Sequence, residues 1–412
     1  MKKIVIQNLS ITLISKIFSF ISFLYIAKIL SQQEYGNFIY INLILSLLPL
    51  FQFGSMHGIV ILLPKYITNH QDKKEELFIT YNSFSILLQI LSIVLLYLFN
   101  IELSPWVLVI IAFNYILSKY MENGQIYLNT HLLFEKANVL KAIDQIVRPI
   151  LILVVFYSYK NIESIFVAHL ATTFLTSVIT FVITKIKFKI FFNIETIKKI
   201  YKIGFFIYLT WGIDILFRSA DRWFISQFYD LKDLASYGFT SALAMNIWLV
   251  AMSFFSPYTQ LLYKAVAQND FFKVKEIVEN TNKNLYILIS VISIVTIIAY
   301  PYLLEFIVHK YFDTYYLFFI LVIVSIFLSV NNMYIYYMIS NNLHFVLLRY
   351  QIIILTINLL LNGLFSFYHL NLVYFAYSTI LSLVIYFILV RRYFYVDINK
   401  KLGTIKNMET SQ

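Results

Sequence analysis

The sequence predicts an all-α, polytopic membrane protein with about twelve transmembrane helices in two six-helix lobes. Of its 412 residues, 60% are hydrophobic and only 13% are charged, and the mean hydropathy is +0.76. Soluble domains carry roughly 25% charged residues. Apolar stretches of about 20 residues, long enough to cross a bilayer as a helix, recur along the whole chain.

Each expected span is an apolar run between short polar turns. The spans cover residues 9–30, 38–63, 78–99, 105–128, 138–158, 164–184, 203–227, 236–262, 284–307, 314–340, 346–368 and 372–391. The fifth is the least regular, because Asp144, Arg148 and Pro149 interrupt its apolar run. No small-residue cleavage site follows the first span, so we expect it to be retained rather than removed as a signal peptide.

Basic residues in the short loops predict the orientation of the spans. With the N-terminus inside, 23 Lys and Arg residues lie in cytoplasmic segments, and the external segments hold only Lys160, Lys232 and Lys310. Reversing the orientation, or removing one span, destroys this asymmetry. Both termini are therefore expected in the cytoplasm.

The spans divide the chain into an N-lobe at 1–190, a C-lobe at 191–396 and a cytoplasmic tail at 397–412. The link at 185–202 alternates basic and apolar residues, so it is either an amphipathic helix on the inner leaflet or an ordinary basic loop. Two lobes are typical of transporters built from repeated halves.

A short internal repeat also supports two halves. Tyr35-Gly36 follows a polar, acidic turn after the first span, and Tyr237-Gly238 follows a similar turn after the seventh. The two tyrosines are 202 residues apart, close to half the chain. We expect a substrate path between the halves, as in other transporters with repeated halves.

Four charged residues interrupt the seventh span: Asp214, Arg218, Asp221 and Arg222. A charge near the bilayer centre costs about 2.5–3.5 kcal/mol on insertion scales, so such residues face protein or water. At about 100° per residue, all four fall within roughly a third of the helix circumference. They form either one stripe facing a polar cavity, with arginines suited to phosphate, or two self-neutralising pairs.

The first six spans add further ionisable residues to the candidate path. These are Lys16, Lys28, His57, Lys119, Glu122, Asp144 and Arg148. Lys119 and Glu122 are three apart, and Asp144 and Arg148 four apart, so each pair has the spacing of an ion pair within one helix. His57 could sense protons, although a hydrogen-bonded buried histidine is the alternative. Asn331 and Asn332 in the tenth span, and Asn358 and Asn362 in the eleventh, are expected to join helices rather than bind ligand.

The residues that an enzyme would need are missing from the sequence. It has no cysteine, no glycine-rich phosphate loop and no His/Glu spacing for a metal. The net charge of +11 lies largely in loops that flank the spans, where it sets orientation rather than marking a nucleic-acid site. We therefore expect a transport protein without a resident cofactor or metal.

Two stretches resemble the polysaccharide flippases of the Wzx type, a family of bacterial cell-surface synthesis. The segment from Ile26 to Phe38, with Glu34-Tyr35-Gly36 at its turn, is similar to one family motif. Asp221-Arg222-Trp223-Phe224-Ile225, followed by Tyr237-Gly238, is similar to another. The family belongs to the superfamily that includes MATE exporters and lipid II flippases.

The resemblance implies two six-helix lobes around a central cavity that open alternately to the two sides of the bacterial inner membrane. It implies an undecaprenyl-diphosphate-linked oligosaccharide as substrate, such as an O-antigen unit, with H⁺ or Na⁺ as a coupling ion. Polysaccharide polymerase and chain-length machinery are implied partners.

Residue by residue, the resemblance and the charges give two sets of candidates. Those for substrate contact are Arg218, Arg222, Lys16, Lys119, Arg148 and Lys28. Those for coupling or counter-charge are Asp214, Asp221, Glu122, Asp144 and His57. A cation-coupled exporter of small molecules on the same fold, and a membrane scaffold that transports nothing, are the alternatives.

Overall fold

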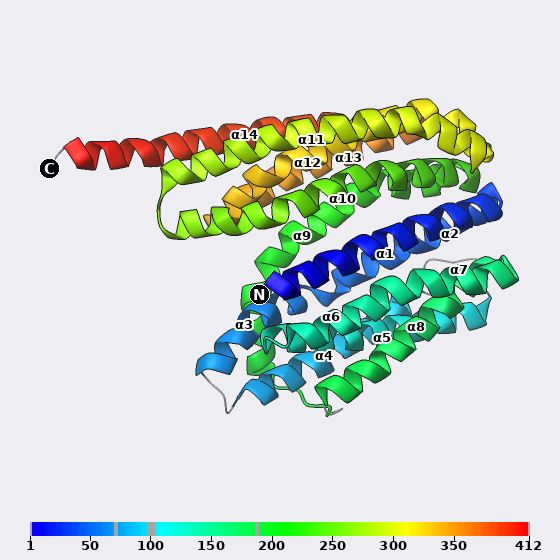
Figure 1. Ribbon diagram of the computed structural model, residues 1–412, viewed down its shortest axis with the longest axis horizontal. Coiled ribbons are helices and arrows are strands. Elements are labelled where there is room, and N and C mark those ends of the chain that lie inside the picture. Colours follow the sequence, from blue (N-terminus) through cyan, green and yellow to red (C-terminus); the bar gives the residue numbers. More distant parts are fainter. Residues whose placement is uncertain (1, 70–72, 97–103, 186–188, 411–412) are drawn as a thin grey trace. The chain divides into compact units, whose positions relative to one another are not determined.

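The computed structural model describes residues 2–69, 73–96, 104–185 and 189–410, and the regular structure in these ranges is helical (Figure 1). The α-helices are α1 Lys2–Ile29, α2 Gln32–Leu47, α3 Ser55–Asn69, α4 Lys74–Leu96, α5 Pro105–Thr130, α6 Phe134–Ala142, α7 Arg148–Tyr159, α8 Ile162–Thr184, α9 Ile194–Phe228, α10 Leu231–Ala267, α11 Phe271–Phe306, α12 Tyr315–Ser340, α13 His344–Phe367 and α14 Val373–Thr410. The all-helical prediction is confirmed.

Each of the twelve expected spans coincides with a helix or with a broken pair of helices. The second span is α2 and α3 joined by a 3-10 turn, Leu48–Gln52, and the fifth is α6 and α7 joined by a π-helical turn, Ile143–Val147. Within the described ranges, nine helices are long and apolar enough to cross a membrane. They correspond to the second, third, sixth and seventh to twelfth expected spans.

Both broken spans have a local cause. The break after the 3-10 turn uses positive φ angles, 46° at Phe53 and 90° at Gly54, a region that glycine enters without steric cost. The break in the fifth span precedes Pro149, which has no N–H for the carbonyl four residues earlier and whose ring would clash with it. Proline is an established cause of helix kinks.

The chain forms two compact units, residues 1–209 and 210–412. In the first, α5 packs on α8 and α4, and α7 lies between α1 and α8. In the second, α12 packs on both α10 and α14, and α13 packs on α14. The division lies inside α9, whereas the sequence placed the lobe boundary between residues 190 and 191.

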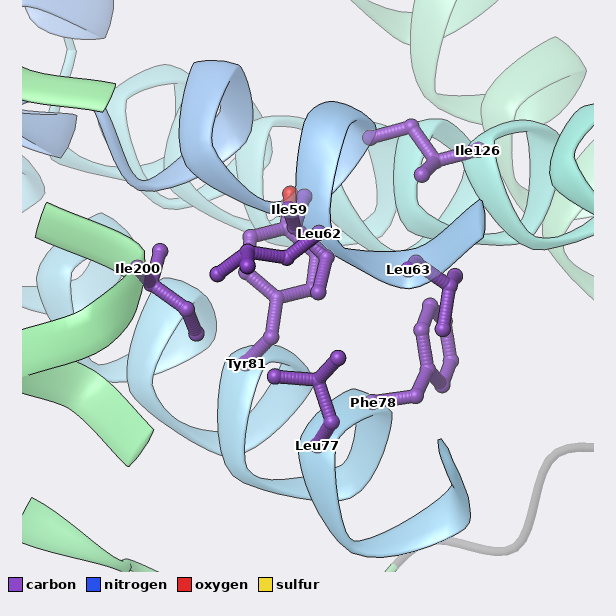
Figure 2. Packing of buried hydrophobic residues seen from close by; sticks show 8 residues of the cluster. All are labelled: Ile59, Leu62, Leu63, Leu77, Phe78, Tyr81, Ile126 and Ile200. Carbon is purple, nitrogen blue, oxygen red and sulfur yellow. The ribbon is translucent and has the colours of Figure 1, made fainter. Parts of the chain in front are cut away.

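The beginning of α9 packs into the first unit. Ile200 joins an apolar cluster with residues of α3, α4 and α5, among them Ile59, Tyr81 and Ile126, all at most 8% exposed (Figure 2). Tyr208 donates a hydrogen bond to the carbonyl oxygen of Leu50, at 2.6 Å. These contacts place the first turns of α9 in the first unit by packing, although the helix runs unbroken to Phe228.

Glycines allow α3 and α9 to cross at backbone contact. A Cβ atom added to Gly204 would lie 2.1 Å from the carbonyl oxygen of Gly54, and one added to Gly58 would lie 2.1 Å from that of Ile200. Because the neighbouring atoms are backbone, no side chain can move aside to make room. Small residues allow membrane helices to approach in this way.

The described residues of the link between the expected lobes form a loop up to Asn193 and a helix from Ile194. Residues 186–188 lie outside the described ranges, and Lys189 to Asn193 are not helical. Ser83 on α4 donates to the carbonyl oxygen of Lys189 and accepts from the N–H of Phe191, while Asn193 caps α9. This segment supports the basic-loop alternative, and the remainder, from Ile194, is the start of α9.

The internal repeat marks the same structural point in both units. Ser31 caps α2 through a reciprocal capping box with Glu34, and Asp230 caps α10 by accepting from the N–H of Asp233. Tyr35 and Tyr237 follow these caps and are at most 2% exposed. The repeated Tyr-Gly therefore lies in the first turns of the second helix of each unit.

The segment at 397–412, expected as a tail, continues α14 as a helix to Thr410. Tyr337 of α12 donates to Asp397 at 2.5 Å, and Lys401 forms an ion pair with Asp397 at 2.9 Å. Lys401 also donates to Asn341, the C-cap residue of α12, at 2.7 Å. This part of α14 is therefore held to its own unit through α12.

We predict that Gly204→Ala destabilises the protein by about 1–3 kcal/mol, the usual cost of overpacking, because its methyl group meets the Gly54 carbonyl. The measurement is the thermal melting midpoint in detergent. Gly403→Ala, where nothing lies within 4 Å of an added Cβ, is the matched control. Equal melting midpoints for the two variants would contradict the tight crossing.

Candidate functional site

The charged residues of α9 separate into two environments. Asp214 and Arg218 form an ion pair one turn apart, with 39% and 23% of their side chains exposed. The Arg218 guanidinium also lies over the ring of Trp248, 4.8 Å from its centroid, which is cation–π geometry. Arg222 donates to the carbonyl oxygen of Arg218 at 3.3 Å. In the described part of the chain, no carboxylate lies within ion-pair distance of Arg222.

Asp221 points into the helix packing of the second unit and is 8% exposed. Its carboxylate accepts from Tyr237 of α10 at 2.5 Å, from Asn362 of α13 at 2.9 Å and from Thr379 of α14 at 2.8 Å. Burying a carboxylate is costly unless hydrogen bonds compensate. Here three neighbouring helices supply them, so Asp221 joins four helices.

The polar group around Asp221 continues along α13 and α14. Asn362 donates to Asn358 at 3.1 Å, and Asn358 donates to Ser378 and Thr379, both at 3.1 Å. Ser378 in turn donates to Asn362. The expectation that these asparagines join helices is confirmed for Asn358 and Asn362. Asn332 instead donates to carbonyl oxygens of its own helix, α12, and the amide atoms of Asn331 have no hydrogen-bond partner among the described residues. Of the two self-neutralising pairs considered for α9, Asp214 with Arg218 forms and Asp221 with Arg222 does not.

A pocket of about 300 Å³ in the first unit brings several of the other candidates together. It lies where α1 meets α6, the π-helical turn and α7. Its lining residues are Ser15, Lys16, Ser19, Lys141, Asp144, Gln145, Arg148 and Pro149. Lys16, Asp144 and Arg148 were candidates from the sequence, and Lys141 was assigned only to the cytoplasmic positive charge.

The helix break at Pro149 builds one wall of this pocket. Arg148 forms an ion pair with Asp144 across the π-helical turn and donates to Thr173 of α8 at 3.4 Å. Ser22 of α1 donates to the carbonyl oxygen of Pro149 at 2.9 Å, which holds α1 against the break. π-Helical turns inside α-helices are frequent at functional sites.

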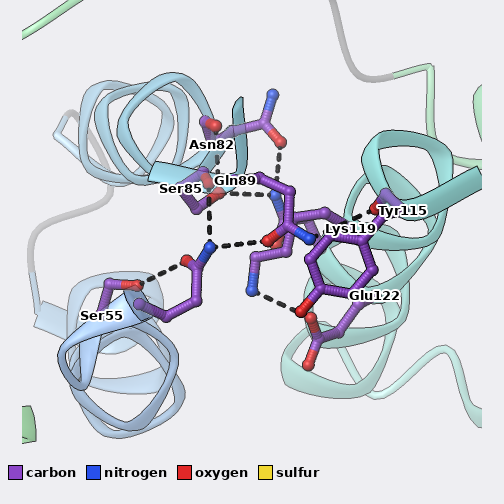
Figure 3. Close-up of polar contacts among 9 residues, drawn as sticks. Ser55, Asn82, Ser85, Gln89, Tyr115, Lys119 and Glu122 are labelled. Carbon is purple, nitrogen blue, oxygen red and sulfur yellow. Dashed lines mark hydrogen bonds and ion pairs between the residues drawn. The ribbon is translucent and has the colours of Figure 1, made fainter. Parts of the chain in front are cut away.

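A second polar group of the first unit surrounds Lys119 and Glu122, which form an ion pair at 2.9 Å (Figure 3). Lys119 is only 4% exposed, whereas Glu122 is 38% exposed. Beside them, Asn123 donates to Asn82 at 2.8 Å and to Ser85 at 2.9 Å. The Lys119 charge is thus neutralised locally within a network that joins α4 to α5.

The same network reaches the broken second span. Gln52 of the 3-10 turn donates to Gln89 at 2.7 Å, and Ser55 donates to Gln52 at 3.3 Å. His57 follows two residues later on α3 and is half-buried. Lys28 is exposed near the end of α1, and neither it nor His57 lines the pocket around Lys16.

Lys16 and Arg218 occupy matching places in the internal repeat. Each precedes the tyrosine of its Tyr-Gly pair by 19 residues. Lys16 is exposed and lines the pocket of the first unit, and Arg218 is partly exposed on α9 of the second. Both units thus place a cation at one repeat position in their first helix.

Sequence reasoning missed the roles of Tyr237, Thr379 and Lys141. Tyr237 belonged to the repeat motif, and its spacing of sixteen residues from Asp221 gave no sign of contact. Thr379 is 158 residues from Asp221. Among the described residues, no group of three or more His, Cys, Asp or Glu side chains could hold a metal ion.

Comparison with known families gives one match. The model of a family described as polysaccharide biosynthesis protein matches residues 25–315, which is more than two thirds of the chain. No curated protein matches the chain significantly.

Solved structures share the fold across nearly the whole length. A multidrug resistance MATE family transporter of the MOP superfamily, in an inward-facing conformation, aligns with a TM-score of 0.77 at 12% identity, over 96% of this chain and 99% of that one. The lipid II flippase MurJ, in an inward closed conformation, aligns with a TM-score of 0.74 at 17% identity, over 99% of this chain and 93% of that one. A MOP superfamily transporter from Pyrococcus furiosus aligns with a TM-score of 0.61 at 12% identity, over 94% of this chain and 93% of that one.

Proposed function

This chain belongs to the family of polysaccharide biosynthesis proteins, and from that premise we propose that it flips a lipid-linked glycan precursor across the inner membrane of a bacterium. Its fold is that of membrane transporters and flippases, and it is an integral membrane protein. The proposed substrate is an undecaprenyl-diphosphate-linked oligosaccharide unit, of O-antigen or a similar surface glycan.

One observation carries this proposal: cations remain in the spans after the ion pairs have formed. Lys16 and Arg222 have no carboxylate within ion-pair distance among the described residues. An unpaired charge in a membrane span is costly and marks a polar pathway. The charge is positive, as an anionic diphosphate requires, and guanidinium groups suit phosphate oxygens.

The chemistry of the substrate explains why a protein is needed. Sugars and a diphosphate cannot enter hydrocarbon without losing their hydration, while a polyprenyl tail is stable there. A flippase therefore has to shelter only the head group. The candidates for contact with it are Arg222, Arg218, Lys16, Arg148, Lys119 and Lys28.

Alternating access is the proposed mechanism. Relatives of this fold have been solved in inward-facing and outward-facing conformations, which are properties of those proteins. We propose that the two units of this chain exchange between two such states, and that each state presents the head group to one side of the membrane. Ion pairs within one helix, such as Asp214–Arg218 and Lys119–Glu122, neutralise part of the positive charge in the spans. An anionic head group then has to neutralise only the cations that remain.

We propose Asp221 as the coupling residue. Its carboxylate is buried, has no cation as a partner within the described residues, and contacts the hydroxyl oxygens of Tyr237 and Thr379. A proton would neutralise it, and a hard cation such as Na⁺ prefers oxygen ligands of this kind. Binding of either at this group, which joins four helices, would change their packing.

The remaining parts of the proposal concern the orientation of the protein and its partners in the cell. Both termini are assigned to the cytoplasm, where the lipid-linked unit is assembled. A polymerase and chain-length machinery outside would consume the product and so favour net export. A second candidate function is export of small molecules, which the likeness to the multidrug transporter favours at the level of fold alone.

We predict that Arg222→Gln removes surface glycan from cells while the protein remains in the membrane, because an unpaired cation of α9 is lost. The measurement is surface polysaccharide on a deletion strain that carries the variant. Arg349→Gln on α13, an exposed arginine, is the matched control and should retain glycan. Intact glycan with Arg222→Gln refutes this site, and drug sensitivity of a deletion strain with intact glycan favours the exporter.

We predict that a Na⁺ or H⁺ gradient stimulates flipping in proteoliposomes at least about tenfold for the wild type and not for Asp221→Asn, since the variant has no charge to titrate or bind. The assay follows a labelled lipid-linked oligosaccharide. A wild-type rate that responds to neither gradient, or an Asp221→Asn variant that keeps the response, would rule out the coupling role.

We predict that Lys232→Cys reacts with a membrane-impermeant maleimide in intact spheroplasts and that Lys273→Cys reacts only after lysis. The native chain has no cysteine, so each variant carries a single thiol. Both lysines are exposed, and the orientation rule places them on opposite sides. Labelling of Lys273→Cys before lysis would reverse the topology.

A further inference from the structure

The pocket between α1 and the broken fifth span has an excess of positive charge. Lys16, Lys141 and Arg148 line it together with one carboxylate, Asp144, so the lining carries two more positive than negative groups. Asp144 is engaged by Arg148 across the π-helical turn. Two lysine side chains from helices far apart in sequence thus meet at one small cavity.

We infer that this pocket is the loading site for the diphosphate of the lipid-linked substrate, on the cytoplasmic side of the first unit. The inference rests on the proposed function and assigns to it Lys141, Ser15, Ser19 and Gln145, in addition to Lys16. The diphosphate binds there before translocation.

The charge of the pocket suits a diphosphate better than an acidic sugar. A diphosphate diester carries two negative charges, which balances the excess of the lining residues, whereas a sugar carboxylate carries one. Without an anion, Lys16 and Lys141 place like charges around one cavity, which is unfavourable.

Hydrogen-bond donors complete the site. The Nη2 atom of Arg148 donates to both the Asp144 carboxylate and the Thr173 hydroxyl, which fixes the guanidinium at the wall of the pocket. The exposed hydroxyl of Ser19 and the side-chain amide of Gln145 offer further donors at the pocket.

Size and position restrict what binds. The volume of about 300 Å³ is at the lower end of ligand pockets, which run from about 300 to 1,000 Å³. It accommodates a diphosphate with little of the attached sugar, not a whole oligosaccharide.

Lys141 is in α6, the first part of the fifth span, close to the expected cytoplasmic loop that holds Lys136. The pocket therefore opens near the side on which the substrate is made.

The first test needs neither a variant nor flipping. Purified full-length protein in nanodiscs is acetylated with an amine-reactive reagent in the presence or absence of inorganic pyrophosphate, at constant ionic strength. We expect pyrophosphate to slow the labelling of Lys16 and Lys141 by about fivefold or more and to leave Lys136 unchanged. Lys136 is on the same helix as Lys141, is exposed and lies outside the pocket.

Equal labelling of Lys141 with and without pyrophosphate would overturn the inference. Equal protection by glucuronate at the same concentration would overturn the choice of diphosphate over an acidic sugar. Protection of Lys136 to the same degree would show general screening of charge, and it too would contradict a specific site.

The second test measures pyrophosphate affinity in variants. Lys141→Gln should weaken it about tenfold, the usual cost of losing one hydrogen bond to a charged group, and Lys141→Arg should keep it within about threefold. Lys136→Gln should bind like the wild type. An unchanged pyrophosphate affinity in Lys141→Gln, with an unchanged melting midpoint, would contradict this binding site.

The two proposals can fail separately. If the wild type does not flip a lipid-linked glycan in proteoliposomes but pyrophosphate still protects Lys16 and Lys141, the proposed function is wrong and the anion site stands. If the wild type flips the glycan and pyrophosphate protects neither lysine, the function stands and this loading site is wrong.

Discussion

The cost of placing charge in hydrocarbon governs the polar architecture of this protein. Each ionic side chain in a span must be paired, hydrogen-bonded or open to water. Most are paired with a partner one turn away in the same helix: Asp214 with Arg218, Lys119 with Glu122 and Asp144 with Arg148. Two of the other cations in the spans, Lys16 and Arg222, therefore indicate where water or an anionic ligand reaches the protein.

Breaks in the helices determine where polar groups can gather. Pro149 ends the regular ladder of the fifth span, and the π-helical turn before it places Asp144 and Arg148 at the pocket wall. The 3-10 turn of the second span carries Gln52 into a network with α4. An unbroken apolar helix offers no comparable positions, because its backbone groups are all used internally.

The two units use their repeat differently. Lys16 and Arg218 are at the same repeat position, but the first unit surrounds its cation with a small basic pocket. The second unit instead buries Asp221 among neutral donors from three other helices. Under the proposed function, an anionic head group and a coupling cation would need opposite local charge, and the two units differ in this sense.

The sequence by itself determined the helices, their expected orientation and the pairs at three- and four-residue spacing, because helix geometry fixes which neighbours meet. It also identified Lys16, Arg148 and Asp221 as unusual residues. Only the tertiary structure decided that Asp221 meets Thr379, 158 residues away, and that Lys141 shares a cavity with Lys16. Such contacts depend on how helices pack, and local spacing carries no record of that packing.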